Sequence, residues 1–165
     1  MILSTLLLGL TPAVFSQEPE ETELEAAQRK VAELEAELGP EHLDLVDSLW
    51  TMAGIYYGQA QYGKAEEAYR RVLSIEEKAL GSEHPEVANS LNSLARLLHI
   101  QGSYAEARPL YERALAIREK ALGPEHLDVA LSINNLAGFL WGQGSYAEAR
   151  PLLERALVIR EKALG

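Results

Sequence analysis

One short segment carries the residues of a phosphate-binding loop. Gly58, Gly63 and Lys64 follow the spacing G-x-x-x-x-G-K, in which backbone N–H groups surround the phosphates and the lysine reaches them. The motif also requires a serine or threonine after the lysine, to hold magnesium, and a β-strand before the first glycine. Here Ala65 follows the lysine, and the residues before Gly58 have the apolar spacing of a helix. We therefore predict that the chain binds no nucleotide and needs no cofactor.

Three histidines recur at a fixed interval, which raises the question of a metal site. His42, His84 and His126 are each 42 residues apart, and imidazole is a common zinc ligand. That interval places them on successive structural units, which packed helices hold about 10 Å or more apart. They are too far apart to share one ion, so we predict that they are linker residues and that the chain has no metal site. His99 lies outside this series and faces either a ligand or solvent.

Residues for covalent or acid–base catalysis do not occur in a recognisable pattern. The 165 residues include no cysteine, which excludes disulfides, thiolate–zinc sites and cysteine nucleophiles. The sequence has no Ser-His-Asp arrangement and no pair of carboxylates placed as in a pocket. Its many glutamates fall on outer helix faces, where exposure to solvent is the usual state. The prediction is that the protein is not an enzyme.

The formal net charge of −10 is concentrated near the N-terminus. Residues 17–47 contain 11 acidic side chains against only Arg29 and Lys30, whereas residues 48–165 contain 14 acidic and 13 basic side chains. No basic stripe runs along the chain, so we expect no nucleic-acid partner. A length of 165 residues with 47% hydrophobic content is enough for one domain with an apolar core.

The elements that would position any site come from an internal repeat. Residues 102–123 match residues 144–165 at 20 of 22 positions, with a shift of 42. The two exceptions are Tyr111 against Leu153 and Ala116 against Val158. The phrase LGPEH at residues 38–42 returns as LGSEH and again as LGPEH, each time 42 residues later. Repetition at a fixed period predicts a stack of similar structural units.

Each unit contains two apolar stripes at helical spacing, and we call the two predicted helices A and B. The A stripes are Leu49, Met52, Ala53 and Tyr56; Leu91, Leu94, Ala95 and Leu98; and Ile133, Leu136, Ala137 and Leu140. The B stripes are Ala65, Ala68, Tyr69, Val72 and Ile75; Ala107, Leu110, Tyr111, Ala114 and Ile117; and Ala149, Leu152, Leu153, Ala156 and Ile159. Two helices alone cannot bury both stripes, so each unit must stack on the next.

The spacing of small and large apolar residues along the A and B stripes resembles that of the tetratricopeptide repeat. The longer period, the NNLA run at residues 134–137 and the YERALAIREKALG run resemble the kinesin-light-chain subclass. The resemblance covers residues 22–165. It implies an all-α fold, a right-handed α-α superhelical solenoid of antiparallel helix pairs. It also implies a protein–protein interaction scaffold that holds a peptide or protein segment in a concave groove lined by the A helices.

The repeat divides the chain into six parts. We expect an apolar N-terminal segment at 1–16, a linker at 17–21 and an N-terminal capping helix at 22–38 whose Leu24, Ala27, Val31 and Leu34 pack inward. The three repeats are expected at 41–81, 83–123 and 125–165.

The first 16 residues decide the predicted location of the protein. They are apolar, too short to span a bilayer, and followed at once by acidic residues, as in a signal peptide. They contain no lysine or arginine, which a signal peptide usually has at its start. We expect a secreted or periplasmic protein if this segment is a signal peptide and a cytoplasmic one otherwise. In neither case is a stable membrane span expected.

Several residues mark the predicted helix ends. Thr22 with Glu25, Ser103 with Glu106, and Ser145 with Glu148 have the spacing of a capping box. Pro109 and Pro151 lie in the second turn of their B helices, which predicts a local bend or a later helix start because proline has no N–H.

The candidate binding residues lie on the A-helix face opposite the packed stripe. Asn92 and Asn134 match the groove asparagine that contacts peptide backbone in the kinesin-light-chain family, and an amide both donates and accepts. Trp50 and Trp141 are either ligand anchors or packing residues between A helices. Arg96 supplies the only positive charge, so a chaperone C-terminal tail is not an expected ligand. The full rows are Asp47, Trp50, Gly54 and Tyr57; Asn89, Asn92, Arg96 and His99; and Leu131, Asn134, Gly138 and Trp141.

Two other functions remain open at this point. The repeats either form a structural segment that stacks end to end on another copy, or belong to a larger protein, such as the regulatory part of a multidomain enzyme. The partner, the source organism and the native length do not follow from the sequence.

Overall fold

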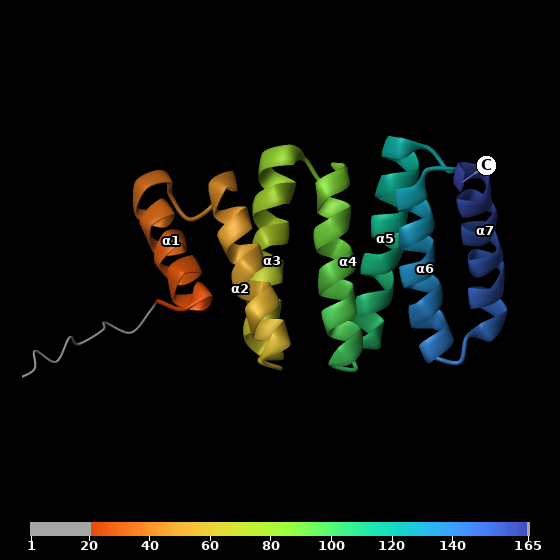
Figure 1. The fold of residues 1–165 in the computed structure, drawn as a ribbon, viewed down its shortest axis with the longest axis horizontal. Helices are drawn as coiled ribbons and strands as arrows, with labels where there is room; N and C mark the ends of the chain where they lie inside the picture. Colours follow the sequence, from red (N-terminus) through yellow and green to blue (C-terminus); the bar gives the residue numbers. More distant parts are fainter. Residues whose placement is uncertain (1–20, 165) are drawn as a thin grey trace, which may run out of the picture.

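The computed structural model describes residues 21–164, and within them the chain is a single row of α-helices (Figure 1). The apolar segment 1–16 and the predicted linker up to residue 20 lie outside the described residues. The described part contains no β-strand, and the all-α solenoid is confirmed. Its elements are α1 (Glu23–Leu38), the 3-10 helix η1 (Leu43–Leu45), α2 (Val46–Gly58), α3 (Tyr62–Leu80), α4 (Pro85–Ile100), α5 (Tyr104–Leu122), α6 (Leu127–Gly142) and α7 (Tyr146–Leu164).

Helices α2, α4 and α6 are the A helices, and α3, α5 and α7 are the B helices. Each A helix packs against its own B helix and also against the helix that precedes it, so α4 lies between α3 and α5 and α6 between α5 and α7. Helix α1 takes the corresponding place before α2. This arrangement buries the stripes of two antiparallel helices at once, which one pair alone cannot do.

The apolar stripes form the core. Ala53, Ala95 and Ala137 on the A helices are fully buried, as are the alanines that begin the B stripes. A methyl group is small enough for two helices to approach closely at these positions. Along the predicted stripes, Met52, Leu110 and Leu152 are half-buried, whereas Leu153 is exposed.

A polar contact repeats within this core. The Oγ atom of Ser90 on α4 donates to the Glu76 carboxylate on α3 at 2.5 Å. One unit later, Arg118 on α5 donates to Ser132 Oγ on α6 at 2.7 Å. Both serines are fully buried, so α3 and α5 each satisfy a buried hydroxyl on the A helix that follows. Burial raises the pKa of the Glu76 carboxyl, and the hydrogen bond from Ser90 opposes that shift.

A second ladder runs across the B helices. Arg113 on α5 pairs with Glu77 on α3 at 2.6 Å and donates to the Ser82 carbonyl in the linker at 2.9 Å. The equivalent arginines of α3 and α7 make the same two kinds of contact, with Glu35 and Pro40 and with Glu119 and Pro124. Each arginine therefore bonds both the neighbouring helix of this layer and the linker that follows that helix.

The helix ends differ in part from the predictions. Thr22 and Glu25 form the expected capping box. The box at Ser103 is wrong, because the Ser103 side chain makes no capping bond and its backbone carbonyl accepts from the N–H groups of Glu106 and Ala107 instead. A later start at Pro109 is also wrong, since α5 begins at Tyr104 and continues through the proline.

The linker histidines have a role that the sequence did not reveal. His42 precedes η1, His84 precedes α4 and His126 precedes α6. In each case Nδ1 of the imidazole accepts from the backbone N–H two residues later, at 3.3, 3.3 and 3.1 Å. The imidazole thus satisfies one of the N–H groups left unpaired at a helix start.

The turn between α2 and α3 contains a strained residue. Ala60 has φ 56°, in the left-handed region, where the equivalent positions of the next two turns hold Gly102 at φ 80° and Gly144 at φ 76°. An L-residue with a Cβ atom is disfavoured there by roughly 1–2 kcal/mol, whereas glycine is not.

We expect Ala60→Gly to raise the free energy of unfolding by about 0.5–1 kcal/mol, because relief of strain exceeds the entropy that glycine adds to the unfolded chain. Chemical denaturation of both proteins measures the difference. Ala116→Gly, at an exposed position inside α5, is the control and should destabilise by about 1 kcal/mol. Equal destabilisation by both changes would contradict the strain at Ala60.

Candidate functional site

The predicted binding residues form four rows across α2, α4 and α6, and the structure places neighbouring rows in different environments. The A helices α4 and α6 touch each other directly. As a result, Asn92 and His99 of α4, which were predicted to face a groove, also meet α6.

Asn92 lies at the contact between α4 and α6. Its side chain is only 8% exposed. Nδ2 donates to the Ala88 carbonyl at 3.0 Å and lies 3.5 Å from Ser132 Oγ, while Oδ1 accepts from Asn135 at 3.4 Å. Most of the hydrogen-bonding capacity of Asn92 is therefore used within the protein. Its equivalent on α6, Asn134, is half-buried.

Trp50 occupies the same row on α2 and packs inside the molecule. It is half-buried and meets the Tyr69 ring edge-on, with 5.1 Å between ring centroids.

The row nearest the start of the A helices consists of Asp47, Asn89 and Leu131. Asp47 is exposed, and Oδ1 of Asn89 accepts a hydrogen bond from Arg118 at 2.5 Å. Leu131 ends that row and is exposed.

The row nearest the A–B turns is aromatic. His99 is half-buried between Tyr104 and Phe139, at centroid distances of 5.7 and 5.2 Å. Tyr57 lies under the guanidinium of Arg96, at 5.1 Å from the ring centroid. Trp141 is more than half exposed and contacts Tyr146 edge-on at 4.7 Å.

A small polar recess opens beside Arg96. It has a volume of about 120 Å³ and is lined by Asn92, Ser93, Arg96, Tyr111 and Asn135, so it draws on α4, α5 and α6. Its polar atoms are an arginine, two amides, a hydroxyl and a phenol. Together they can donate hydrogen bonds to a carbonyl or a carboxylate.

Three residues of the recess were not among the predicted binding residues. Ser93 and Asn135 each follow a predicted residue by one position, and the second asparagine of the NNLA run was the available signal. Tyr111 was predicted to be a core residue and is 4% exposed, with its ring beside Phe139 at 5.5 Å. Burial raises the pKa of Tyr111 to about 12, so its phenol stays protonated at neutral pH.

Arg96 is one of four arginines of the described residues, with Arg118, Arg150 and Arg160, that form no ion pair with a carboxylate there. It is exposed and has no carboxylate within ion-pair distance. By contrast, ion pairs engage Arg29, Arg70, Arg71, Arg108, Arg113 and Arg155. The guanidinium of Arg96 is held over Tyr57 and remains available to a ligand.

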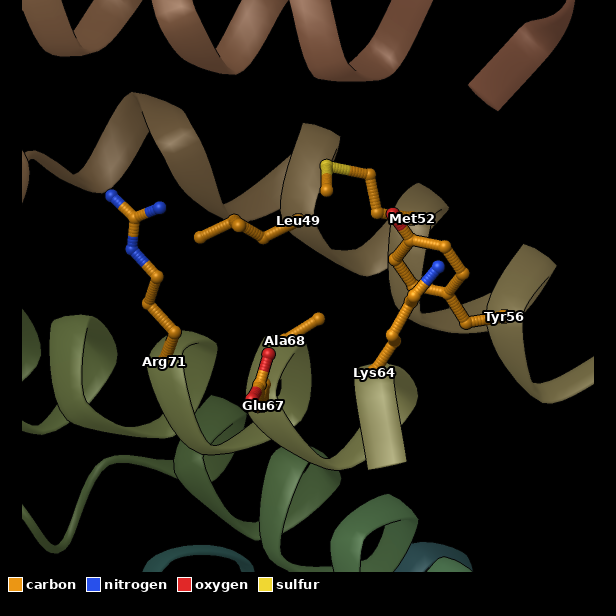
Figure 2. Close-up of a pocket in the computed structure, with 7 residues that line it drawn as sticks. All are labelled: Leu49, Met52, Tyr56, Lys64, Glu67, Ala68 and Arg71. Atoms are coloured by element: carbon orange, nitrogen blue, oxygen red, sulfur yellow. The ribbon is translucent and has the colours of Figure 1, made fainter. Parts of the chain in front are cut away.

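A larger hollow of about 290 Å³ lies between α2 and α3 (Figure 2). Its floor is apolar and includes Met52 and Ala68, and Lys64 and Arg71 stand at its two ends. Ala68 lines the hollow at a position that holds leucine in the other two repeats. Arg71 is already bound to Glu35 and to the Pro40 carbonyl, and the ammonium of Lys64 lies 5.3 Å from the centroid of the Tyr56 ring.

The described residues give little support to nucleotide binding, to a metal site or to a membrane span. The residues before Gly58 form α2, so the G-x-x-x-x-G-K spacing joins two helices instead of following a strand. Between residues 21 and 164, no three His, Asp or Glu side chains gather as a metal site would require. None of the described helices combines the length and apolar character needed to cross a membrane.

Comparison with known proteins gives one family. The family model described as "Tetratricopeptide repeat" matches residues 47–120 and 86–162. No curated protein matches the chain. A solved structure of a putative kinesin light chain from Podosopora anserina, with nearly identical TPR-like repeats, is 33% identical, with a TM-score of 0.73 over 85% of this chain. The Q17M form of that protein is also 33% identical, with a TM-score of 0.75 over 86% of this chain.

A third structure, BtubC (BKLC) from P. vanneervenii, shares the fold, with a TM-score of 0.77 and 24% identity over 87% of this chain. The chain spans 66% of each Podosopora structure and 58% of BtubC. The matched family model spans most of the chain. The stacked helix pairs of this chain agree with those of the similar structures. The chain belongs to the tetratricopeptide repeat family, and its repeats are of the kinesin-light-chain-like kind.

Proposed function

We propose that this protein is a non-enzymatic scaffold that binds a peptide segment of another protein along its A helices. The fold suggests protein partners, because stacked repeats present one long continuous surface. The binding surface we assign is the recess beside Arg96 together with the aromatic row formed by Tyr57, His99 and Trp141.

The observation that carries this proposal is the exposed guanidinium of Arg96, which forms no ion pair with a described carboxylate, at a recess with several hydrogen-bond donors. Asn135, Ser93 and Tyr111 add neutral donors around one positive charge. This set matches an acidic side chain, or a backbone carbonyl next to one, better than a basic group. The repeats do not strongly repel an acidic ligand, because residues 48–165 are nearly neutral. The excess of acidic side chains lies in residues 17–47.

The recess changes which asparagine we assign to ligand binding. Asn92 is largely satisfied by its contacts with Ala88, Ser132 and Asn135. Asn135 is exposed, and its amide reaches the recess. We therefore assign backbone capture to Asn135, with Asn92 as the residue that orients it. Asn134 and Trp141 extend the same surface toward α7.

A second candidate is that the chain is the interaction segment of a larger protein, including the regulatory part of an enzyme. It is favoured by the lengths of the similar structures, of which the chain spans about two thirds or less. Peptide binding by the A helices is compatible with this role. We keep export as a proposal that depends on residues 1–16; cytoplasmic location is the alternative.

We expect Arg96→Ala to weaken the binding of acidic peptides. Peptides selected on the parent chain from a random display library should contain an Asp or Glu that cannot be replaced by Asn or Gln. Loss of the charged hydrogen bonds should reduce their affinity about tenfold or more, since such bonds contribute roughly 1.5–3 kcal/mol. Fluorescence anisotropy with a labelled selected peptide measures the change.

The matched control is Arg150→Ala, which removes an exposed arginine on α7 and should leave affinity unchanged. Thermal unfolding should be the same for the parent and both variants. Selected peptides without an acidic residue, bound equally well by the Arg96 variant, would refute the assignment of the recess.

The larger hollow gives an independent test of where the peptide binds. Ala68→Leu should fill the hollow, as leucine does in the other two repeats, and raise the free energy of unfolding by about 1 kcal/mol through added apolar burial. The affinity for the selected peptide should not change. Reduced affinity would place the peptide in the hollow between α2 and α3 instead of at Arg96.

A further inference from the structure

The larger hollow between α2 and α3 lies where the first repeat departs from the other two. Ala68 lines the hollow, and the equivalent positions on α5 and α7 hold half-buried leucines. Lys64 also lines it, where the other two repeats hold Glu106 and Glu148. The first repeat therefore combines a smaller apolar side chain with the opposite charge at the same place on its B helix.

Helix α1 borders this hollow as well. The Nε2 atom of Gln28 donates a hydrogen bond to the phenol oxygen of Tyr56 at 2.9 Å, and Glu35 forms an ion pair with Arg71. Tyr56 and Arg71 are both residues that line the hollow. Three helices therefore surround an apolar depression that has a few polar groups at its edge, as in many small-molecule sites.

The two ends of the hollow differ in their capacity to bind an anion (Figure 2). At one end, Arg71 is already bound to Glu35 and to the Pro40 carbonyl. At the other end, Lys64 is exposed and forms no ion pair with a described carboxylate. Its ammonium is held 5.3 Å from the centroid of the Tyr56 ring. A negative group is therefore expected at the Lys64 end.

The phenol of Tyr56 supplies a second donor at that end. Its oxygen accepts a hydrogen bond from Gln28, and a phenol that accepts one hydrogen bond can still donate through its own O–H. An ammonium and an O–H group together suit the oxygen atoms of one carboxylate. Beyond them the floor of the hollow is apolar and is formed by Leu49, Met52 and Ala68.

We propose that the larger hollow binds a medium-chain fatty acid, with its carboxylate at Lys64 and Tyr56 and its alkyl chain along the apolar floor. Lys64 and Arg71 are seven residues apart on α3, which corresponds to roughly 10 Å along a helix. An alkyl chain of medium length covers that distance. A second carboxylate at the far end is not expected, because Arg71 is already paired there.

The site is tested by isothermal titration calorimetry of the full chain with octanoate as the probe. The parent chain should bind one octanoate. Ala68→Leu should abolish binding, because the larger side chain occupies the floor on which the alkyl chain lies. Thermal unfolding of this variant should show that it remains folded. Octanoate should raise the unfolding temperature of the parent and leave that of Ala68→Leu unchanged.

Charge variants test the carboxylate end separately. Lys64→Met should weaken octanoate binding about tenfold or more, because a hydrogen bond between two charged groups is lost. Glu67→Gln should strengthen binding, because it removes a negative charge that lines the hollow. Lys30→Met is the matched control, since it removes an exposed lysine of α1, and it should bind octanoate like the parent.

A neutral probe separates the contribution of the carboxylate from that of the alkyl chain. Octan-1-ol has the same chain without the charge and should bind the parent about tenfold more weakly than octanoate. The proposal is overturned by a parent chain that binds no octanoate, by equal binding of octanoate and octan-1-ol, by undiminished binding to Ala68→Leu, or by equal losses in Lys64→Met and Lys30→Met.

Competition with the selected peptide distinguishes this site from the proposed peptide surface. The larger hollow and the recess beside Arg96 share no lining residue. Saturating octanoate should therefore leave the affinity for the peptide unchanged, and Arg96→Ala should bind octanoate like the parent. Displacement of the peptide by octanoate would show that the hollow holds a peptide side chain, which would overturn the assignment to a fatty acid.

Discussion

One pair of helices cannot bury its own apolar surface, and the rest of the structure depends on this constraint. Each B helix presents one side to its own A helix and a second side to the A helix of the next unit. Alanines at the closest crossings, such as Ala95 and Ala107, let the helices approach until the larger side chains interlock. The surface between the A helices and the order of the helices both follow from this requirement.

Because the repeat is so regular, most of the fold could be predicted from the sequence. A period of 42 and two stripes of helical spacing determine which sides face inward, and most stripe residues are buried, with Met52, Leu110 and Leu152 half-buried and Leu153 exposed. The errors concern local backbone chemistry. The Ser103 side chain leaves its helix start uncapped, and the histidines cap theirs through an imidazole nitrogen, which is not among the usual capping groups.

The site was harder to predict, because its residues depend on neighbouring units. A helix turns by about 100° per residue, so a shift of one position moves a side chain to a different environment. Asn92 and Ser93 differ in this way, since both border the recess but Asn92 is buried and bonded to α6, whereas Ser93 is half-buried. The burial of Asn92 depends on Ser132 and Asn135, which lie about one period further along the chain. Nothing within a single repeat shows which of two adjacent asparagines a neighbour will cover.

The buried serines carry a consequence for how such a chain changes over evolutionary time. Ser90 donates a hydrogen bond to the carboxyl group of Glu76, while Ser132 accepts one from the guanidinium of Arg118. A hydroxyl group accommodates either polarity by rotating about one bond. The junction between units thus tolerates reversal of charge at its most enclosed polar position. Duplicated units can diverge there, or be rearranged in order, while the joint between them stays intact.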